Sequence, residues 1–123
     1  MRLLIYGETA MHALVIEDEL MIAAEIEFVL RECGFTTVDI ARSSEAAIDA
    51  AAANSPDLIT ADSDLRPGCG IETVCAISPQ PATPVIFITA NAKDVRRRMP
   101  QNTVLPKPFS EQTLAYTIAA ALA

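Results

Sequence analysis

Three acidic residues at the ends of two apolar runs are the first whose types and spacing point to chemistry. Glu17 and Asp18 follow HALVI directly, and Asp62 follows residues 57–61. If the two runs form neighbouring parallel strands, their carboxyl ends bring the three carboxylates into one crevice. Unpaired carboxylates at close range repel one another, and a hard divalent cation such as Mg²⁺ relieves this repulsion. The pattern therefore predicts a Mg²⁺ site.

A threonine and a lysine occupy equivalent positions at the ends of two later runs. Thr89 ends VIFIT, and Lys107 follows a short run that begins at residue 103. A hydroxyl donor and an ammonium point charge both suit the oxygens of a phosphoryl group. Ala90 is small enough to leave Asp62 accessible. Each polar residue alone is an ordinary surface residue, but packing does not explain the set, which predicts phosphoryl chemistry.

The elements expected to position these residues alternate along the chain. Strands are predicted at residues 12–16, 36–40, 57–61, 85–89 and 103–105. Helices are predicted at residues 20–33, from Ser43 or Ser44 to about 54, at 71–77, at 93–99 and after Ser110. This alternation predicts an α/β fold, a doubly wound five-stranded parallel sheet with helices on both faces.

The position of Pro106 helps to fix the strand order. Proline lacks a backbone donor, so the strand next to Pro106 suits an edge of the sheet, whereas the apolar strand 85–89 suits a central place. Right-handed crossovers leave few other choices, and the order 2-1-3-4-5 satisfies them. The first and third strands then lie together at the switch point, where a crevice opens.

Length and composition limit the function. The 123 residues are enough for one domain, predicted at 12–123, with residues 1–11 as an N-terminal extension. A net charge of −7 argues against nucleic-acid binding. Apolar runs are too short for a membrane span. The three cysteines form no CxxC motif, which suits a reducing cytoplasm.

Four motifs in order carry a family resemblance over about residues 13–122. VIEDE, PDLITADSDLRPGCG, VIFITA and LPKPF resemble the motifs of the response-regulator receiver domain of two-component signalling, a flavodoxin-like fold. The resemblance implies that Asp62 is the phosphoacceptor, which takes a phosphoryl group from a sensor histidine kinase or a histidine phosphotransfer protein. It also implies a cis peptide at Lys107-Pro108.

The resemblance also implies the role of each crevice residue. Asp18 is the direct Mg²⁺ ligand, Glu17 acts largely through water, and the Asp64 carbonyl, like Asp62, belongs to the metal shell. Thr89 and Lys107 bind the phosphoryl oxygens. Catalysis of this kind rests on positioning and charge neutralisation.

Three positions concern signalling and timing. Val104 stands where the family usually has an aromatic switch residue. The side chains of Asp64 and Asn91 border the approach to phosphorus and are expected to tune dephosphorylation. Only 18 positions separate Thr89 from Lys107, so a short fourth helix is expected.

The expected function is that of a cytoplasmic, single-domain phosphoprotein rather than an enzyme. It is expected to act as a monomer or weak homodimer and to signal to a downstream protein target through the surface of helix 93–99, strand 103–105 and the last helix. Two alternatives stay open. One is a phosphorylation-independent (pseudo-receiver) interaction module, and the other is a small Mg²⁺-dependent phosphatase with an aspartate nucleophile.

Three further features are interpreted more simply. The run 96–98 of three arginines is expected to be a solvated helix face, with partner docking as the alternative. His12 is expected to be structural or exposed, because no second metal ligand lies near it in the sequence. Tyr116 is expected to pack at the rim of the last helix rather than to contact a partner.

Overall fold

The computed structural model describes residues 10–77 and 83–123; residues 1–9 and 78–82 lie outside the described part of the chain. Most of the predicted N-terminal extension is therefore not described. Strands and helices alternate, in the order β1 (Met11–Ile16), α1 (Leu20–Glu32), β2 (Phe35–Ala41), α2 (Ser44–Ala53), β3 (Leu58–Ala61), α3 (Gly70–Ile77), β4 (Val85–Thr89), α4 (Ala92–Arg98), β5 (Thr103–Pro106) and α5 (Glu111–Leu122). The predicted elements are all present, with ends that differ by at most one residue.

The five strands form one parallel sheet in the order β2-β1-β3-β4-β5, which confirms the predicted topology. Pro106 lies in the edge strand β5, as its missing donor requires. β4 is an inner strand between β3 and β5, but the middle of the sheet is β3.

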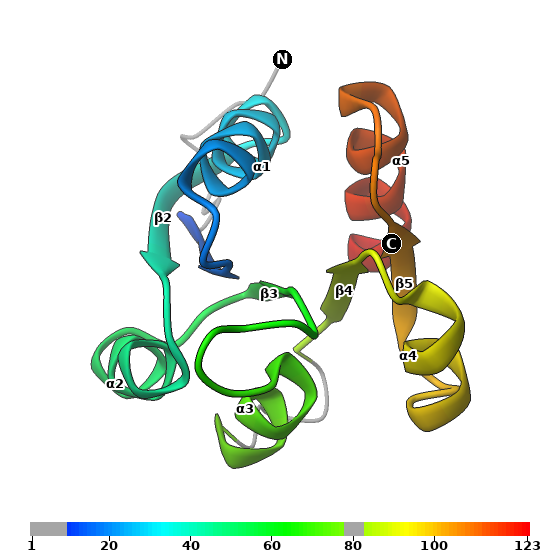
Figure 1. Ribbon diagram of the computed structural model, residues 1–123. Helices are drawn as coiled ribbons and strands as arrows, with labels where there is room; N and C mark the ends of the chain where they lie inside the picture. The colour runs from blue at the N-terminus through cyan, green and yellow to red at the C-terminus, as the bar shows by residue number, and fades with distance from the viewer. Residues whose placement is uncertain (1–9, 78–82) are drawn as a thin grey trace.

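Helices cover both faces of the sheet (Figure 1), and each face has its own apolar cluster. The first cluster packs α1 and α5 on one face, and includes Val15, Ile26, Leu30, Ile86, Leu105 and Ile118. The second packs α2, α3 and α4 on the other, and includes Leu14, Ile59, Ala61, Val74, Phe87 and Val95. Burying one such large side chain stabilises the fold by about 1.5–3 kcal/mol, so the two clusters fix the strands rigidly beneath the site.

Local signals define several helix ends. Ser43 caps α2 by accepting the N–H of Ala46, and Ser110 caps α5 by accepting the N–H of Thr113. Gly34 follows α1 with φ at 105°, a value that glycine adopts without strain. The cap of α2 is thus Ser43 and not Ser44, the other serine that the sequence offered.

The start of β3 differs slightly from the prediction. Leu58 is its first residue, and Asp57 directly before it makes two hydrogen bonds to β1. The Asp57 carboxylate accepts the N–H of His12 at 2.8 Å, and the Asp57 N–H donates to the His12 carbonyl at 2.7 Å. None of the described helices is long and apolar enough to cross a membrane.

Candidate functional site

Backbone hydrogen bonds hold the ends of β1 and β3 at the switch point of the sheet. The N–H of Asp62 donates to the Ile16 carbonyl at 3.0 Å, and the N–H of Glu17 donates to the Ala41 carbonyl at 3.0 Å. The side chains that follow these strands therefore meet at the carboxyl edge of the sheet, as the sequence predicts.

Three carboxylates gather at this edge. One oxygen each from Glu17, Asp18 and Asp62 lie within 4.8 Å of one another, and no other group of three potential metal ligands is found among the described residues. Glu17 is 1% exposed and Asp62 5%. Hard carboxylate oxygens at this spacing fit a divalent cation such as Mg²⁺.

Lys107 neutralises part of this negative charge. Its Nζ lies 2.8 Å from Glu17 Oε1 and 2.8 Å from Asp62 Oδ2. The N–H of Lys107 donates to the Thr89 carbonyl at 2.8 Å, and the Lys107-Pro108 peptide is cis, as the family resemblance implies. The ammonium group is thus fixed over the acidic cluster from the opposite side of the crevice.

The pKa values of Glu17 and Lys107 are both shifted in the crevice. Burial raises the pKa of Glu17 above its ordinary value, although the hydrogen bond from Lys107 opposes the rise. Burial alone would lower the pKa of Lys107, but the hydrogen bonds and charges of Asp62 and Glu17 outweigh it and raise that pKa. The lysine therefore stays charged at neutral pH.

The loop between β3 and α3 folds back onto Asp62. A Cβ placed on Gly70 would lie 1.8 Å from the Asp62 carbonyl oxygen, so only glycine fits there. The N–H of Gly70 donates to the Ser63 carbonyl at 3.0 Å, and the N–H of Asp64 donates to Asp62 Oδ1 at 3.0 Å. These contacts fix the backbone that follows Asp62 and orient its carboxylate.

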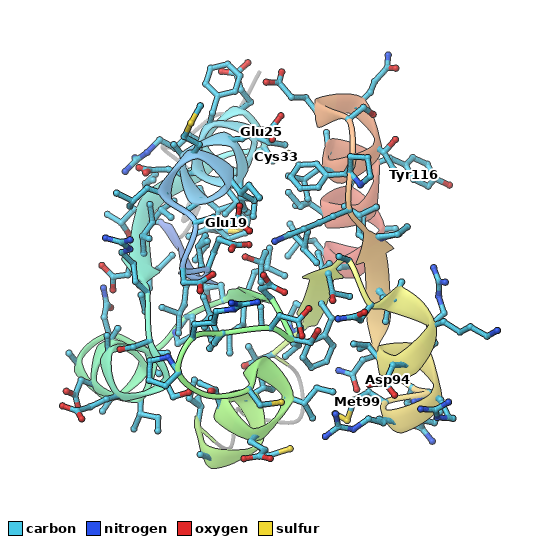
Figure 2. All side chains as sticks on the ribbon, in the orientation of Figure 1. Glu19, Glu25, Cys33, Asp94, Met99 and Tyr116 are labelled. Atoms are coloured by element: carbon cyan, nitrogen blue, oxygen red, sulfur yellow. The ribbon has the colours of Figure 1, made fainter. Side chains whose placement is uncertain are left out.

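A polar crevice of about 360 Å³ opens above these groups. It is lined by Asp18, Glu19, Asp62, Asp64, Arg66, Ala90 and Lys107. Figure 2 shows Glu19 on the chain that leads into α1. The crevice is large enough for a hydrated cation together with a phosphoryl group.

Thr89 lies directly before Ala90 and does not line the crevice itself, and its hydroxyl is engaged elsewhere. Thr89 is fully buried, its Oγ1 lies 2.7 Å from Ser63 Oγ, and it accepts the N–H of Asn91 at 2.9 Å. Asn91 reaches further, because its Nδ2 donates to Asp64 Oδ2 at 2.5 Å. The last bond joins the loops after β3 and β4 across the mouth of the crevice.

Val104 lies in β5 beside Phe87 of β4 and packs, half-buried, against the second apolar cluster. The predicted short fourth helix is present, since α4 has 7 residues.

Sequence reasoning missed three residues of the site: Ser63, Arg66 and Glu19. Only the register of β3 and β4 reveals Ser63: the pairing of Ala61 with Phe87, continued by two residues, places Ser63 beside Thr89.

The three further features have clear outcomes. Arg97 and Arg98 are exposed and form ion pairs with Asp94 on α4, which fits a solvated helix face and leaves partner docking as the alternative. His12 is buried, and its ring nitrogens contact Thr37 and Asp39, so its role is structural. The expected packing of Tyr116 is wrong: its side chain is 77% exposed and projects outward from α5 (Figure 2), because it lies two residues from both Leu114 and Ile118 and so opposite the buried face of the helix.

The fold and the crevice define a class of protein: a doubly wound α/β domain with clustered carboxylates and a lysine at the switch point of its sheet. Residues 13–119 match the model of the response regulator receiver domain family. The chain belongs to this family, whose domains are phosphoacceptor signalling modules of two-component systems rather than enzymes.

Curated relatives and solved structures agree with this family assignment. The chain is 32% identical over 120 residues to the phyllosphere-induced regulator PhyR of Methylorubrum extorquens, covering 94% of this chain and 45% of PhyR. The solution structure of the PhyR receiver domain of Erythrobacter litoralis is 34% identical, with a TM-score of 0.83, covering 92% of this chain and 90% of that one. The Vibrio cholerae chemotaxis protein CheY4, at 23% identity, shares the fold, with a TM-score of 0.80 over 92% of this chain and 99% of that chain.

The chain spans about half the length of the curated relatives it matches, since it covers 45% of PhyR and 48% of the Bacillus subtilis regulator YvrH. These relatives therefore contain segments without a counterpart in this chain. The similarity therefore extends to the receiver domain of these relatives and not to their whole length.

Proposed function

We propose that Asp62 accepts a phosphoryl group from a phosphohistidine of a sensor histidine kinase or a histidine phosphotransfer protein. A carboxylate oxygen of Asp62 attacks phosphorus, the phosphorus–nitrogen bond breaks, and the leaving imidazole keeps the bonding electron pair. The carrying observation is the cluster of three carboxylate oxygens within 4.8 Å, with Lys107 hydrogen-bonded to two of the three residues.

Mg²⁺, when bound, supplies the charge neutralisation that phosphoryl transfer needs. Asp18 and Asp62 would hold it directly, Glu17 would act through water, and the Asp64 carbonyl would complete the protein's ligands. Lys107 binds a phosphoryl oxygen as a point charge. Thr89 donates a hydrogen bond to a second oxygen, after its hydroxyl has turned from its present partners.

Labelling by acetyl phosphate tests the proposal. The parent protein is expected to become phosphorylated with Mg²⁺ and to lose the label in excess chelator. The variant Asp62→Asn should take up no label, whereas Asp57→Asn should label normally, because Asp57 precedes β3 and Asp62 follows it, at opposite ends of the strand. Equal labelling of Asp62→Asn and the parent would refute the assignment.

The proposed function includes a surface that passes the signal on to a partner. The surface of α4, β5 and α5 carries the signal to a downstream protein target, and the protein acts in the cytoplasm as a monomer or weak homodimer. The support is local: α4 follows Thr89 after only two residues, and β5 leads directly into Lys107. A change at either residue therefore reaches this surface through a few covalent bonds.

A phosphorylation-independent interaction module is the second candidate. Val104 in place of an aromatic switch residue, and an α4 of 7 residues, favour it. Titration with beryllofluoride and Mg²⁺, followed by NMR, separates the two. Shifts that spread from the crevice to α4 and β5 support the phosphoacceptor, and an unchanged spectrum there supports the constitutive module.

A further inference from the structure

Ser63 and Thr89 form a buried pair of hydroxyl groups directly behind the crevice. Ser63 is 8% exposed and Thr89 0%, and their oxygens are 2.7 Å apart. The two residues follow Ala61 and Phe87, a registered pair of β3 and β4, by two positions each. Side chains two residues apart share one face of a strand, so this pair belongs to the face covered by α2, α3 and α4.

The groups of the proposed phosphoryl site belong to the other face. Glu17 and Lys107 follow Val15 and Leu105 by two positions, and both of these apolar residues pack in the cluster under α1 and α5. Lys107 binds Asp62 as well as Glu17. The Thr89 hydroxyl is therefore bonded away from the carboxylate that it would serve.

We propose that Ser63 is a positioning residue that holds the Thr89 hydroxyl away from Asp62 until a phosphoryl group competes for it. This inference rests on the proposed function and deepens it. It assigns to the residue after the phosphoacceptor a hydroxyl exchange, in which Thr89 leaves Ser63 and donates to a phosphoryl oxygen.

The hydrogen-bond capacity of Thr89 makes the exchange selective. Its oxygen also accepts the N–H of Asn91, a second hydrogen bond that holds the hydroxyl in its present orientation. Turning the hydroxyl toward Asp62 also leaves the buried Ser63 hydroxyl without this partner, which is costly. Both effects favour the resting arrangement, and only a strong acceptor such as a phosphoryl oxygen overcomes them.

The test compares the affinity for beryllofluoride with Mg²⁺ in the parent and in Ser63→Ala. Loss of one hydrogen bond from the resting state is worth about 1 kcal/mol, so the variant should bind about fivefold more tightly. Ser63→Cys keeps the side-chain volume with a weak donor and should shift affinity in the same direction. Unchanged or weaker binding in both variants would overturn the proposal.

Two controls separate positioning from structure. Ser44→Ala removes another serine–threonine hydroxyl pair, because Ser44 Oγ lies 2.5 Å from Thr73 Oγ1. It should lower stability without changing beryllofluoride affinity. In a Thr89→Val background, Ser63→Ala should no longer change the affinity, since no hydroxyl remains to be released. An equal gain in that background would contradict the role of Ser63.

A second measurement needs neither Mg²⁺ nor beryllofluoride. Three-bond couplings of the Thr89 methyl group report its side-chain rotamer by NMR. One rotamer is expected in the parent and averaging between rotamers in Ser63→Ala; a single unchanged rotamer would overturn the proposal. If the parent binds no beryllofluoride and takes no label, the proposed function fails, and this measurement still decides whether Ser63 holds Thr89.

Discussion

Lys107 and Glu17, ninety residues apart in sequence, are joined by a 2.8 Å hydrogen bond between Nζ and Oε1. The carboxylate is 1% exposed and the lysine side chain 12%. Breaking such a pair by removing one partner leaves a buried charge without compensation. Removing Lys107 leaves two such charges, those of Glu17 and Asp62, because its ammonium group binds both carboxylates.

Lys107→Met should therefore destabilise the metal-free protein by roughly 3–5 kcal/mol. Mg²⁺ should restore part of this loss, because the cation replaces the missing positive charge among the carboxylates. Urea unfolding with and without Mg²⁺ measures both effects. Lys93→Met, an exposed lysine of α4, is the matched control and should change stability by less than about 0.5 kcal/mol. Equal stability of the two variants would contradict the prediction.

The raised pKa of Glu17 predicts the pH dependence of stability without Mg²⁺. The folded protein holds this proton more tightly than the unfolded chain, so protonation of Glu17 favours folding. Its contribution is fully present below the ordinary value of 4.5 and is lost as pH rises through the folded-state pKa. The unfolding free energy of the parent minus that of Glu17→Gln should fall over this range. A difference that rises with pH would show the opposite shift.

Thr60 has a buried hydroxyl with no hydrogen-bond partner among the described residues. It lies in β3 between Val15 and Ile86, its partners in the neighbouring strands. Thr60→Val removes the unpaired group at nearly constant volume, and should stabilise the protein by about 1 kcal/mol. Thr73→Val is the control and should destabilise it, since the Thr73 hydroxyl bonds the Cys69 carbonyl. Thermal unfolding of both variants provides the comparison, and a lower melting temperature for Thr60→Val would contradict it.

Gly70 sets the distance between α3 and the backbone of Asp62. In Gly70→Ala the new Cβ would lie 1.8 Å from the carbonyl oxygen of Asp62 and 2.6 Å from its carbon, so the backbone must move. We expect a loss of at least about 3 kcal/mol in stability and a weaker response to Mg²⁺. Glu72→Ala, exposed on the same helix, should change neither. Parent-like unfolding and Mg²⁺ titration of Gly70→Ala would show that the loop adapts.

The sequence predicts the fold and the carboxylate cluster because both follow from a simple geometric rule. Parallel strands end at one edge, so Glu17, Asp18 and Asp62 must meet once strands 1 and 3 are neighbours. The bond between Ser63 and Thr89 is harder to predict, because it depends on register and on side-chain rotamers. The exposure of Tyr116 could have been predicted from helical periodicity, because Tyr116 lies two residues from both Leu114 and Ile118 and so opposite the buried face of α5.

Asp64 and Asn91 should act as one unit in controlling the lifetime of the phosphorylated protein. Their side chains are 2.5 Å apart across the mouth of the crevice, and the Asp64 N–H also holds Asp62 Oδ1. Removing either partner frees the other, so Asp64→Ala, Asn91→Ala and the double variant should change the dephosphorylation rate by similar factors. Decay of the labelled protein after removal of acetyl phosphate measures this coupling in a double-mutant cycle. Independent residues would instead give multiplicative rate changes, which would show that the bond between the loops has no part in the timing.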